Sequence, residues 1–577
     1  MTQKNNQAVS LILAHINDTH SYFEPSSLQL ELNIEQQQLK PYVSAGGFAR
    51  IATRTQQLRE QAQQRDLGFL FLHAGDCFQG TLYFSLFKGR ANAELLNALN
   101  IDAMALGNHE LDMGNEPVAR FLTRIEFPLL AGNWDVSNES NNKTIRVSDS
   151  PKLVPYQPKS QHAGWITKQV QGGEVAIFSL ALDKMADISN PDQDTPFINS
   201  IDVAKATVEA IHAQGIKNII LLSHLGYEAD LELAKQVEGI GIIVGGHSHR
   251  LQGDFSGVGL AKDDDYGQCI NDTYVVQAGY HALSMGHSEI TFDDNGQVIA
   301  FNGKNELLLG RRLCLDATLS DAYQDDFHSK ASDYLRQHEH IVICKKDPQV
   351  HDILLNKYIP RVRKLQETIV AQSDSPLRHV RIPDQDGPSV LAPLVAESFA
   401  FMMKQQGYAV DFAIHNAGGV RASLNPGNIT IADIAGKLLP FAVPIGVYEI
   451  QGCYLAAILE GAINNALNNG VEGTGSGSYP YVHNLDFTYV ADNPMGKRIV
   501  DLRIFSTDEQ WQPVEQERWY KGTSSAYTMK GKEGYDAILN MHKYGKVTHF
   551  SMADCFSEFL QNNPERIQQL NTSYCQS

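Results

Sequence analysis

Carboxylate, amide and imidazole side chains follow a series of short apolar runs in the first half of the chain. Five runs end in this way, and the residues that follow them are Asp18, His20, Asp76, Asn108, His109, His224, His247 and His249. Mixed oxygen and imidazole ligands of this kind suit divalent transition-metal ions. The pattern predicts a pair of divalent ions bridged by Asp76, with His109 left over for another role. Any one motif alone could be a set of hydrogen-bonded structural residues, but five in succession favour a metal site.

The apolar runs themselves predict strands. They alternate with amphipathic segments, and we expect strands within residues 10–16, 67–76, 103–110, 127–134, 174–182, 218–226, 241–249 and 273–280. Continuous Val, Ile and Leu runs are typical of strands buried on both faces and covered by helices. Reactive groups in such sheets collect at the carboxyl ends of the strands. In an extended segment, residues i and i+2 point to one side, so Asp18 with His20, and His247 with His249, should converge.

A chain of 577 residues is too long for one hydrophobic core. We predict a first α/β domain over residues 1–310, whose sheet closes near residues 288–301. A polar, helical connector without strands is expected over 311–370. A second α/β domain is expected over 371–577, with strands within residues 412–422, 446–452, 485–490 and 499–505.

Composition limits the partners and the compartment. The net charge of −19 argues against non-specific nucleic-acid binding, so an anionic substrate would need local positive charge from metal ions or a few arginines. No apolar stretch has the length of a membrane span. The apolar run near the N-terminus is too short for a signal peptide and is better interpreted as a first strand. Seven scattered cysteines without a CxxC motif indicate reduced thiols in a cytoplasmic protein. Removal of a leader would instead indicate a periplasmic or exported protein.

The order D-x-H, G-D, G-N-H-E, H, G-H-x-H resembles that of the calcineurin-like metallophosphoesterase family. In the second half, HNAGGVR, LLPFAVP and YTMKGKEGYD resemble three motifs of the 5′-nucleotidase C-terminal domain. The chain is therefore similar to the 5′-nucleotidase family from about residue 10 to about residue 550. This resemblance implies an N-terminal four-layer sheet sandwich followed by a C-terminal α/β domain that binds the substrate.

The resemblance also implies roles for the polar residues. Two divalent ions, of Mn, Zn, Mg, Fe or Co, would be held by Asp18, His20, Asp76, Asn108, His224, His247 and His249. His109 would be the catalytic histidine, and Asp112 can orient it because residues i and i+3 share a helix face. The two cations would lower the pKa of a bound water, which then attacks the phosphorus. We expect Glu110 to be a solvated charge without a chemical role, and Cys77 to be a small packing residue.

The C-terminal domain of the family supplies the residues that contact the substrate. By resemblance, phosphate would be bound by Arg421 and by Arg381, with Arg378 as the competing candidate. A nucleobase would stack between Phe441 and Tyr527. Asn416 would contact the base or the sugar. Glu533 stands where the family has an Asp that holds the ribose hydroxyls.

These observations predict metal-dependent hydrolysis of a small-molecule phosphate ester, with nucleoside 5′-monophosphates as the favoured substrates. Three activities of the same machinery stay open: 2′,3′-cyclic-nucleotide phosphodiesterase, UDP-sugar hydrolase and sugar-phosphate phosphatase. A further alternative is a non-catalytic nucleotide-binding protein. We expect no nucleic-acid partner and no membrane span, and the oligomeric state is left open.

Overall fold

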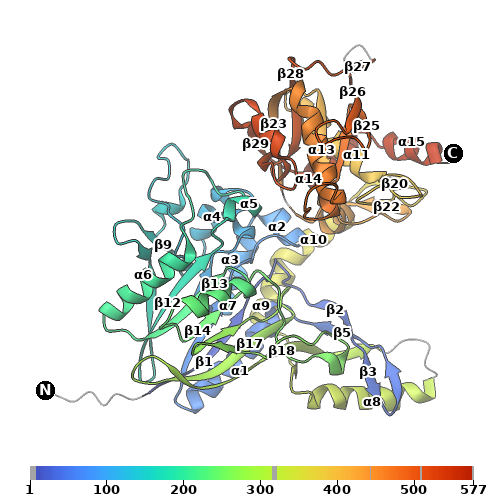
Figure 1. Cartoon of the computed structure of the whole chain (residues 1–577). Helices are drawn as coiled ribbons and strands as arrows, with labels where there is room; N and C mark the ends of the chain where they lie inside the picture. The colour runs from blue at the N-terminus through green and yellow to red at the C-terminus, as the bar shows by residue number, and fades with distance from the viewer. Residues whose placement is uncertain (1–7, 315–320, 442, 507–509, 575–577) are drawn as a thin grey trace. The chain divides into compact units, whose positions relative to one another are not determined.

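The computed structural model describes residues 8–314, 321–441, 443–506 and 510–574 (Figure 1). The chain divides into two compact units. The first comprises Met1–Gln79, Leu86–Ala186 and Pro191–Pro360, and the second comprises Gly80–Ser85, Asp187–Asn190 and Arg361–Ser577.

Two sheets build the first unit. The larger has the order β10 (His162–Ala163), β9 (Leu153–Gln157), β8 (Leu129–Ala131), β7 (Ala103–Ala105), β6 (Gly68–His73), β1 (Val9–Ile16), β17 (Ser284–Phe292), β18 (Val298–Cys314), β5 (Tyr42–Ala45) and β2 (Ser26–Gln29). The smaller has the order β11 (Trp165–Val170), β12 (Gly173–Ala181), β13 (Asn218–His224), β14 (Ile242–Val244), β16 (Thr273–Val276) and β15 (Gln268–Ile270). All eight strands predicted for this half are present.

The core of the first unit lies between the two sheets. Fully buried residues such as Leu11 and Leu72 of the larger sheet pack against Ile220 and Val244 of the smaller. Helices α6 (Ser200–Ala213) and α7 (Tyr227–Gln236) cover the outer face of the smaller sheet. Helix α1 (Phe48–Gln64) packs on β1 and β6 of the larger sheet, and α3 (Arg90–Leu99) packs on α1. The four-layer α/β sandwich is therefore confirmed.

Strand direction explains why one edge of this unit carries the polar residues. Strands β1, β6 and β7 are parallel neighbours in one sheet, and β12, β13 and β14 are parallel neighbours in the other. Parallel neighbours have their carboxyl ends at a common edge, where the loops that follow can meet. Every segment predicted to carry a metal ligand ends or follows one of these strands.

The predicted connector differs from the structure, because residues 311–370 are not free of strands. Strand β18 continues to Cys314, β19 (Ile341–Ile343) pairs with it in parallel, and β20 (Ile369–Ser373) pairs with β22 (Gly427–Thr430). Helix α8 (Asp321–Gln337) packs on β19 and on β3 (Leu32–Ile34), which pairs with β4 (Gln37–Leu39). A three-residue strand has too few residues to show a period, so its pairing with a distant strand decides its conformation.

Two sheets also build the second unit. The five-stranded sheet has the order β24 (Pro480–His483), β21 (Phe412–Asn416), β28 (Trp519–Ser525), β23 (Pro444–Gln451) and β29 (Lys546–Ser551), and the other joins β25 (Leu485–Tyr489), β26 (Ile499–Phe505) and β27 (Trp511–Pro513). Helix α13 (Gly452–Leu467) buries Leu455 and Leu459 against Phe412 and Ile450. Helices α11 (Leu391–Gln405) and α14 (Met552–Asn562) pack on each other. The second α/β domain is thus also confirmed.

The remaining helices are short. They are α2 (Leu82–Phe87), α4 (Asn115–Leu122), α5 (Met185–Ile188), α9 (Pro348–Ile353), α10 (Ile359–Gln366), α12 (Ile431–Asp433) and α15 (Glu565–Tyr574). Across the four described ranges, no helix has both the length and the apolar character needed to cross a membrane.

Candidate metal centre

The structure brings the seven predicted metal ligands together at the carboxyl edge of the first unit. Carboxylate oxygens and imidazole nitrogens fall into three groups whose atoms lie within 4.8 Å of one another. The groups are Asp18, His20 and His249; Asp76, His224 and His247; and His20, Asp76 and His109. Asn108, which has an amide oxygen, contacts two members of the second group.

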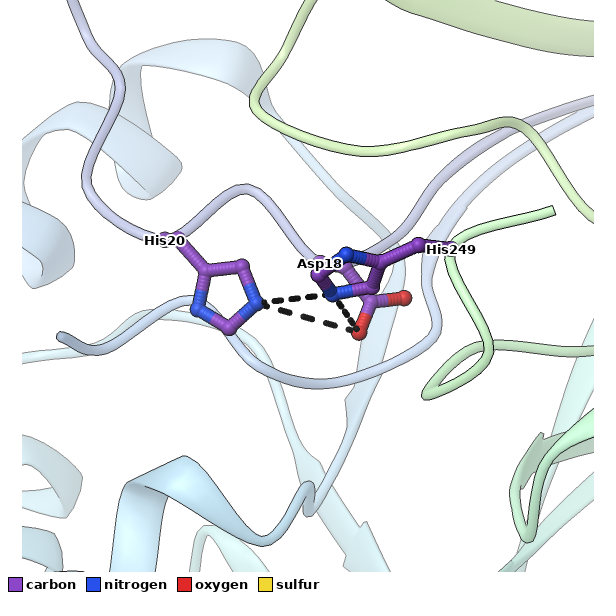
Figure 2. Close-up of side chains that lie close together, drawn as sticks. All are labelled: Asp18, His20 and His249. Carbon is purple, nitrogen blue, oxygen red and sulfur yellow. Dashed lines mark hydrogen bonds and ion pairs between the residues drawn. The ribbon is translucent and has the colours of Figure 1, made fainter. Parts of the chain in front are cut away.

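The first group converges on one point (Figure 2). The Nε2 atoms of His20 and His249 lie 3.1 Å apart, and His249 Nε2 lies 3.3 Å from Asp18 Oδ1. The other ring nitrogen of His20, Nδ1, lies 3.1 Å from the carbonyl oxygen of Phe78 and can donate to it. This bond leaves a lone pair on Nε2 facing the group, which is the usual arrangement of a histidine that binds a metal.

The second group has the same construction. Asp76 Oδ2 lies 3.1 Å from His224 Nε2, and Asn108 Oδ1 lies 3.2 Å from that nitrogen and 2.9 Å from His247 Nδ1. His224 Nδ1 lies 2.7 Å from the carbonyl oxygen of Ala74 and can donate to it. Asp76 also lies in the group with His20, so it contributes to two of the three groups.

The backbone that presents these ligands is not extended, contrary to the geometry assumed for both pairs. Positive φ angles occur at Asp18 (47°), His20 (45°), Asp76 (58°), His247 (72°) and His249 (55°). This left-handed conformation costs a non-glycine residue about 1–2 kcal/mol. Such strain persists where surrounding contacts determine the conformation, and it clusters at functional sites. The paired side chains do converge, but tight left-handed turns bring them together.

The protonation states of most of these groups suit metal binding. Burial raises the pKa of Asp76, but His224 and His109 outweigh it and hold the pKa well below its usual range. Burial and the neighbouring His224 lower the pKa of His247 to about 4, so its ring is neutral. Burial would lower the pKa of His224 too, yet the Asp76 carboxylate raises it to about 10. A cation that binds there would therefore displace a proton from His224.

His109 and Asp112 form the expected pair. His109 begins a single turn of 3₁₀ helix, His109–Leu111, and its Nδ1 lies 2.6 Å from Asp112 Oδ2. Residues i and i+3 eclipse one another in a 3₁₀ helix, so this short turn brings the two side chains together as well as the expected helix would. Burial lowers the pKa of His109, but Asp112 and Asp76 outweigh it and raise the pKa to about 10.

Cys77 has the environment of a packing residue, as predicted. It is buried, and burial together with Glu110 raises the pKa of its thiol well above the usual range. A thiol that stays protonated is a poor nucleophile.

Four of the predicted substrate residues lie near one another in the second unit. Asn416 ends β21, and Tyr527 follows the parallel neighbour β28. Asn416 Oδ1 accepts a hydrogen bond of 3.3 Å from Thr528, the residue after Tyr527. Burial raises the pKa of Glu533, while the hydroxyl of Tyr527 and the charge of Arg381 act on it in the opposite direction.

The other two predicted substrate residues form a separate contact. The Arg421 guanidinium lies over the ring of Phe441, with its carbon 5.8 Å from the ring centroid. Arg421 is exposed, and one of its nitrogens lies 3.4 Å from the carbonyl oxygen of Gly418. The stacking of a base between Phe441 and Tyr527 stays a prediction.

Arg378 and Arg381 differ in exposure and in the contacts of their guanidinium groups. The Arg378 guanidinium is held inside its own loop, where it pairs with Asp384 and donates to the carbonyl oxygen of Gly387. Arg381 is exposed, and within the described ranges its guanidinium has no hydrogen-bond partner. Its donors are therefore available to an anion.

Comparison with known proteins finds a matching family model in each half of the chain. The family model for calcineurin-like phosphoesterases matches residues 11–251, and that for the 5′-nucleotidase C-terminal domain matches residues 369–540. The chain is 30% identical to the NAD 5′-nucleotidase of Haemophilus influenzae over 579 residues, an alignment that covers 97% of this chain and 91% of that protein. The chain belongs to the 5′-nucleotidase family.

Further similarities extend along almost the whole chain. A probable 5′-nucleotidase of Treponema pallidum is 31% identical over 92% of this chain and 87% of its own length. The solved structure of Haemophilus influenzae NAD nucleotidase has a TM-score of 0.63 at 30% identity and covers 97% of each chain. A 5′-nucleotidase precursor from Thermus thermophilus has a TM-score of 0.63 at 28% identity and covers 96% of each chain.

Membership of the 5′-nucleotidase family establishes the reaction class. The chain is a metal-dependent hydrolase of phosphate esters, and its clustered Asp and His groups supply ligands for divalent ions. Bound divalent ions would neutralise phosphoryl oxygens and activate water for attack.

The roles of two residues of this 5′-nucleotidase-family site were not predicted from the sequence. Glu110 was expected to be solvated, but it is 1% exposed and its carboxylate accepts hydrogen bonds from the backbone of the Asp76 loop. Asn17 was not considered, although its amide nitrogen donates to Asp18 Oδ2 and to the carbonyl oxygen of Gly279, both at 2.7 Å. The only sequence signal for either is its position beside a predicted ligand, because each also bonds to a segment that is distant in sequence.

Proposed function

We propose that the chain hydrolyses nucleoside 5′-monophosphates to nucleoside and phosphate with two divalent ions. One ion would be held by Asp18, His20, Asp76 and His249, and the other by Asp76, Asn108, His224 and His247. The observation that carries the proposal is the position of Asp76 between two ligand groups, beside the His109–Asp112 pair.

Each residue of the pair has a distinct task. Asp112 accepts from His109 Nδ1 at 2.6 Å and thereby fixes the orientation of the ring. His109 then presents Nε2 to the oxygen on which negative charge develops, either at the phosphoryl group or at the leaving group. A preoriented donor of this kind stabilises the transition state more than the ground state.

The residues of the second unit are proposed to bind the substrate. Arg381 and Arg421 would donate to the phosphate, since planar guanidinium groups match its oxygens. Phe441 and Tyr527 would stack on the base, and Asn416 would contact the base or the sugar. Glu533 would accept from the ribose hydroxyls.

A panel of phosphate esters tests the proposed substrate class. AMP, NAD, UDP-glucose, 2′,3′-cyclic AMP and glucose 6-phosphate would each be assayed with Mn, Zn, Mg, Fe and Co. NAD is included because a relative with 30% identity is named NAD 5′-nucleotidase. We expect the highest kcat/KM for AMP. A sugar phosphate that outruns every nucleotide would contradict the nucleotide assignment, and release of no phosphate with any metal would indicate a binding protein.

Glu533 should give the enzyme a preference for ribose. We expect kcat/KM for AMP to exceed that for 2′-deoxy-AMP and 3′-deoxy-AMP by about 5- to 150-fold. The reason is that a missing hydroxyl leaves an acceptor of the half-buried Glu533 unpaired, at a cost of about 1–3 kcal/mol. Glu533→Gln should reduce this preference mainly through KM.

The control for this experiment is Asp536→Asn, which neutralises an exposed carboxylate in the next turn. It should leave the ribose preference unchanged. Equal kcat/KM for ribose and deoxyribose substrates in the unaltered enzyme would rule out the ribose-holding role of Glu533.

We further propose that the chain works in a reducing compartment, the cytoplasm. The six cysteines inside the described ranges, Cys77, Cys269, Cys314, Cys344, Cys453 and Cys555, are free. The seventh, Cys575, lies outside those ranges. Titration of the denatured protein without reductant should therefore detect seven thiols. A count of five or fewer would indicate a disulfide and an exported protein.

A further inference from the structure

The Glu110 carboxylate is buried beside the metal centre and accepts four backbone hydrogen bonds. Its Oε1 accepts from the backbone N–H of Cys77 at 2.7 Å and of Phe78 at 3.0 Å. Its Oε2 accepts from the backbone N–H of Gly107 at 2.8 Å and of Asp76 at 3.0 Å. One side chain therefore binds three consecutive residues of the Asp76 loop and Gly107 of its own loop.

A second contact runs in the opposite direction. Asp76 Oδ1 accepts from the backbone N–H of His109 at 2.8 Å. Each loop thus contributes a carboxylate that binds the backbone of the other. The two contacts link the shared metal ligand to the turn that carries Asn108, His109 and Glu110.

The Asp76 loop needs such a restraint. Asp76 has a φ of 58° and follows Gly75, whose φ is 92°. Aspartate tolerates the left-handed conformation better than most residues, but the conformation still costs free energy that other bonds to the backbone can offset. The bonds from Glu110 engage the N–H groups of this residue and of the next two, so they act directly on the strained segment.

The contacts require a carboxylate rather than any polar group of the same size. All four backbone partners are donors, and hydrogen bonds to an ionised acceptor are about twice as strong as neutral ones. A glutamine at this position has nearly the same shape. Its NH₂ group would face two N–H donors and leave them unpaired, at about 1–3 kcal/mol for each buried group.

We propose that Glu110 is a positioning residue of the metal centre. This inference rests on the proposed function. Its carboxylate holds the Asp76 loop in the left-handed conformation and locks that loop to the Asn108–His109 turn. The bridging carboxylate of Asp76 and the catalytic imidazole of His109 are thereby held at a fixed position relative to each other. Glu110 itself touches neither ion nor substrate.

The test compares Glu110→Gln with Glu139→Gln. Glu139 is a matched control, because it is 6% exposed in the same unit and its carboxylate also accepts from a backbone N–H, that of Ser148 at 2.9 Å. Calorimetric titration of the metal-free proteins with Mn²⁺ would measure affinity and stoichiometry. Visible absorption of the Co²⁺-loaded proteins would report the ligand geometry, and thermal melting would report stability.

Glu110→Gln should weaken Mn²⁺ binding by about tenfold or more and should change the Co²⁺ spectrum. Second-sphere changes at metal sites typically cost 10–100-fold in affinity. Glu139→Gln should lower only the melting temperature. Glu110→Asp keeps the charge on a shorter side chain and should restore part of the affinity, and this comparison also serves if the glutamine variant does not fold.

Three outcomes are distinguishable. Unchanged Mn²⁺ affinity and an unchanged Co²⁺ spectrum in Glu110→Gln would overturn the positioning role, even if the melting temperature falls. Equal losses of affinity in the Glu110 and Glu139 variants would also overturn it, because the effect would then reflect stability alone. Failure of the unaltered protein to bind divalent ions would instead contradict the proposed function.

Discussion

Replacing His109 with alanine is expected to lower kcat by about two or more orders of magnitude while both metal ions stay bound. This is the usual scale of loss when one preoriented donor to the transition state is removed. The ring is already oriented in the structure, with Nδ1 2.6 Å from Asp112, and the ligand groups around Asp18 and His224 do not require it. KM should change little, because the interaction belongs to the transition state.

The measurements are steady-state kinetics with AMP and metal analysis of the purified variant. Asp112→Asn tests the orienting role, and its loss of kcat should be substantial, with metal content unchanged. His212→Ala, on an exposed part of α6, is the control for removing an imidazole. His109 also lies in a group with His20 and Asp76 that could hold an ion. A His109→Ala variant that loses stoichiometric metal would therefore show that His109 is a ligand and that the proposed role is wrong.

Replacing Asp76 with alanine should have the opposite effect and remove both ions. Asp76 contributes to groups on both sides of the centre, and its Oδ1 also holds the backbone of His109. Loss of the shared carboxylate removes a ligand from each ion and a negative charge from between two cations. Phosphate release should fall to background.

Asp18→Ala provides the matched comparison. Asp18 belongs only to the group with His20 and His249, so this variant should keep about one ion per chain where Asp76→Ala keeps none. Metal analysis after gel filtration would measure both. Two ions retained by the Asp76 variant would contradict the assignment of Asp76 as the bridge.

The sequence by itself predicted which carboxylate and imidazole side chains come together at the site. Asp18, Asp76, His224 and His247 each end or follow an apolar run, and an apolar run buried on both faces has few alternatives to a strand in a covered sheet. Parallel strands place their carboxyl ends at one edge, so local sequence was enough to predict that these side chains meet. The same reasoning predicted eight strands of the first half, and the structure has all eight.

Only the tertiary structure decided how the backbone presents these groups. Asp18 and Asp76 lie in left-handed turns that their own sequence does not favour, because hydrogen bonds from distant loops hold them there. Strand β19 could not be predicted from sequence for the same reason, because its pairing with β18 decides its conformation. A three-residue segment has no period of its own to reveal it.

The burial of Glu110 shows this division most clearly. Sequence indicates a charged residue directly after a histidine and three residues after a glycine, which is as typical of a solvated turn as of a buried one. Four backbone donors, three of them more than thirty residues away, convert that carboxylate into a buried structural anion. The positions of these strands and the polar residues that follow them are therefore predictable from local sequence, because period and propensity act over a few residues. Conformation at the site follows from tertiary contacts, because the free energy that holds strained turns and buried charges comes from groups that folding alone brings together.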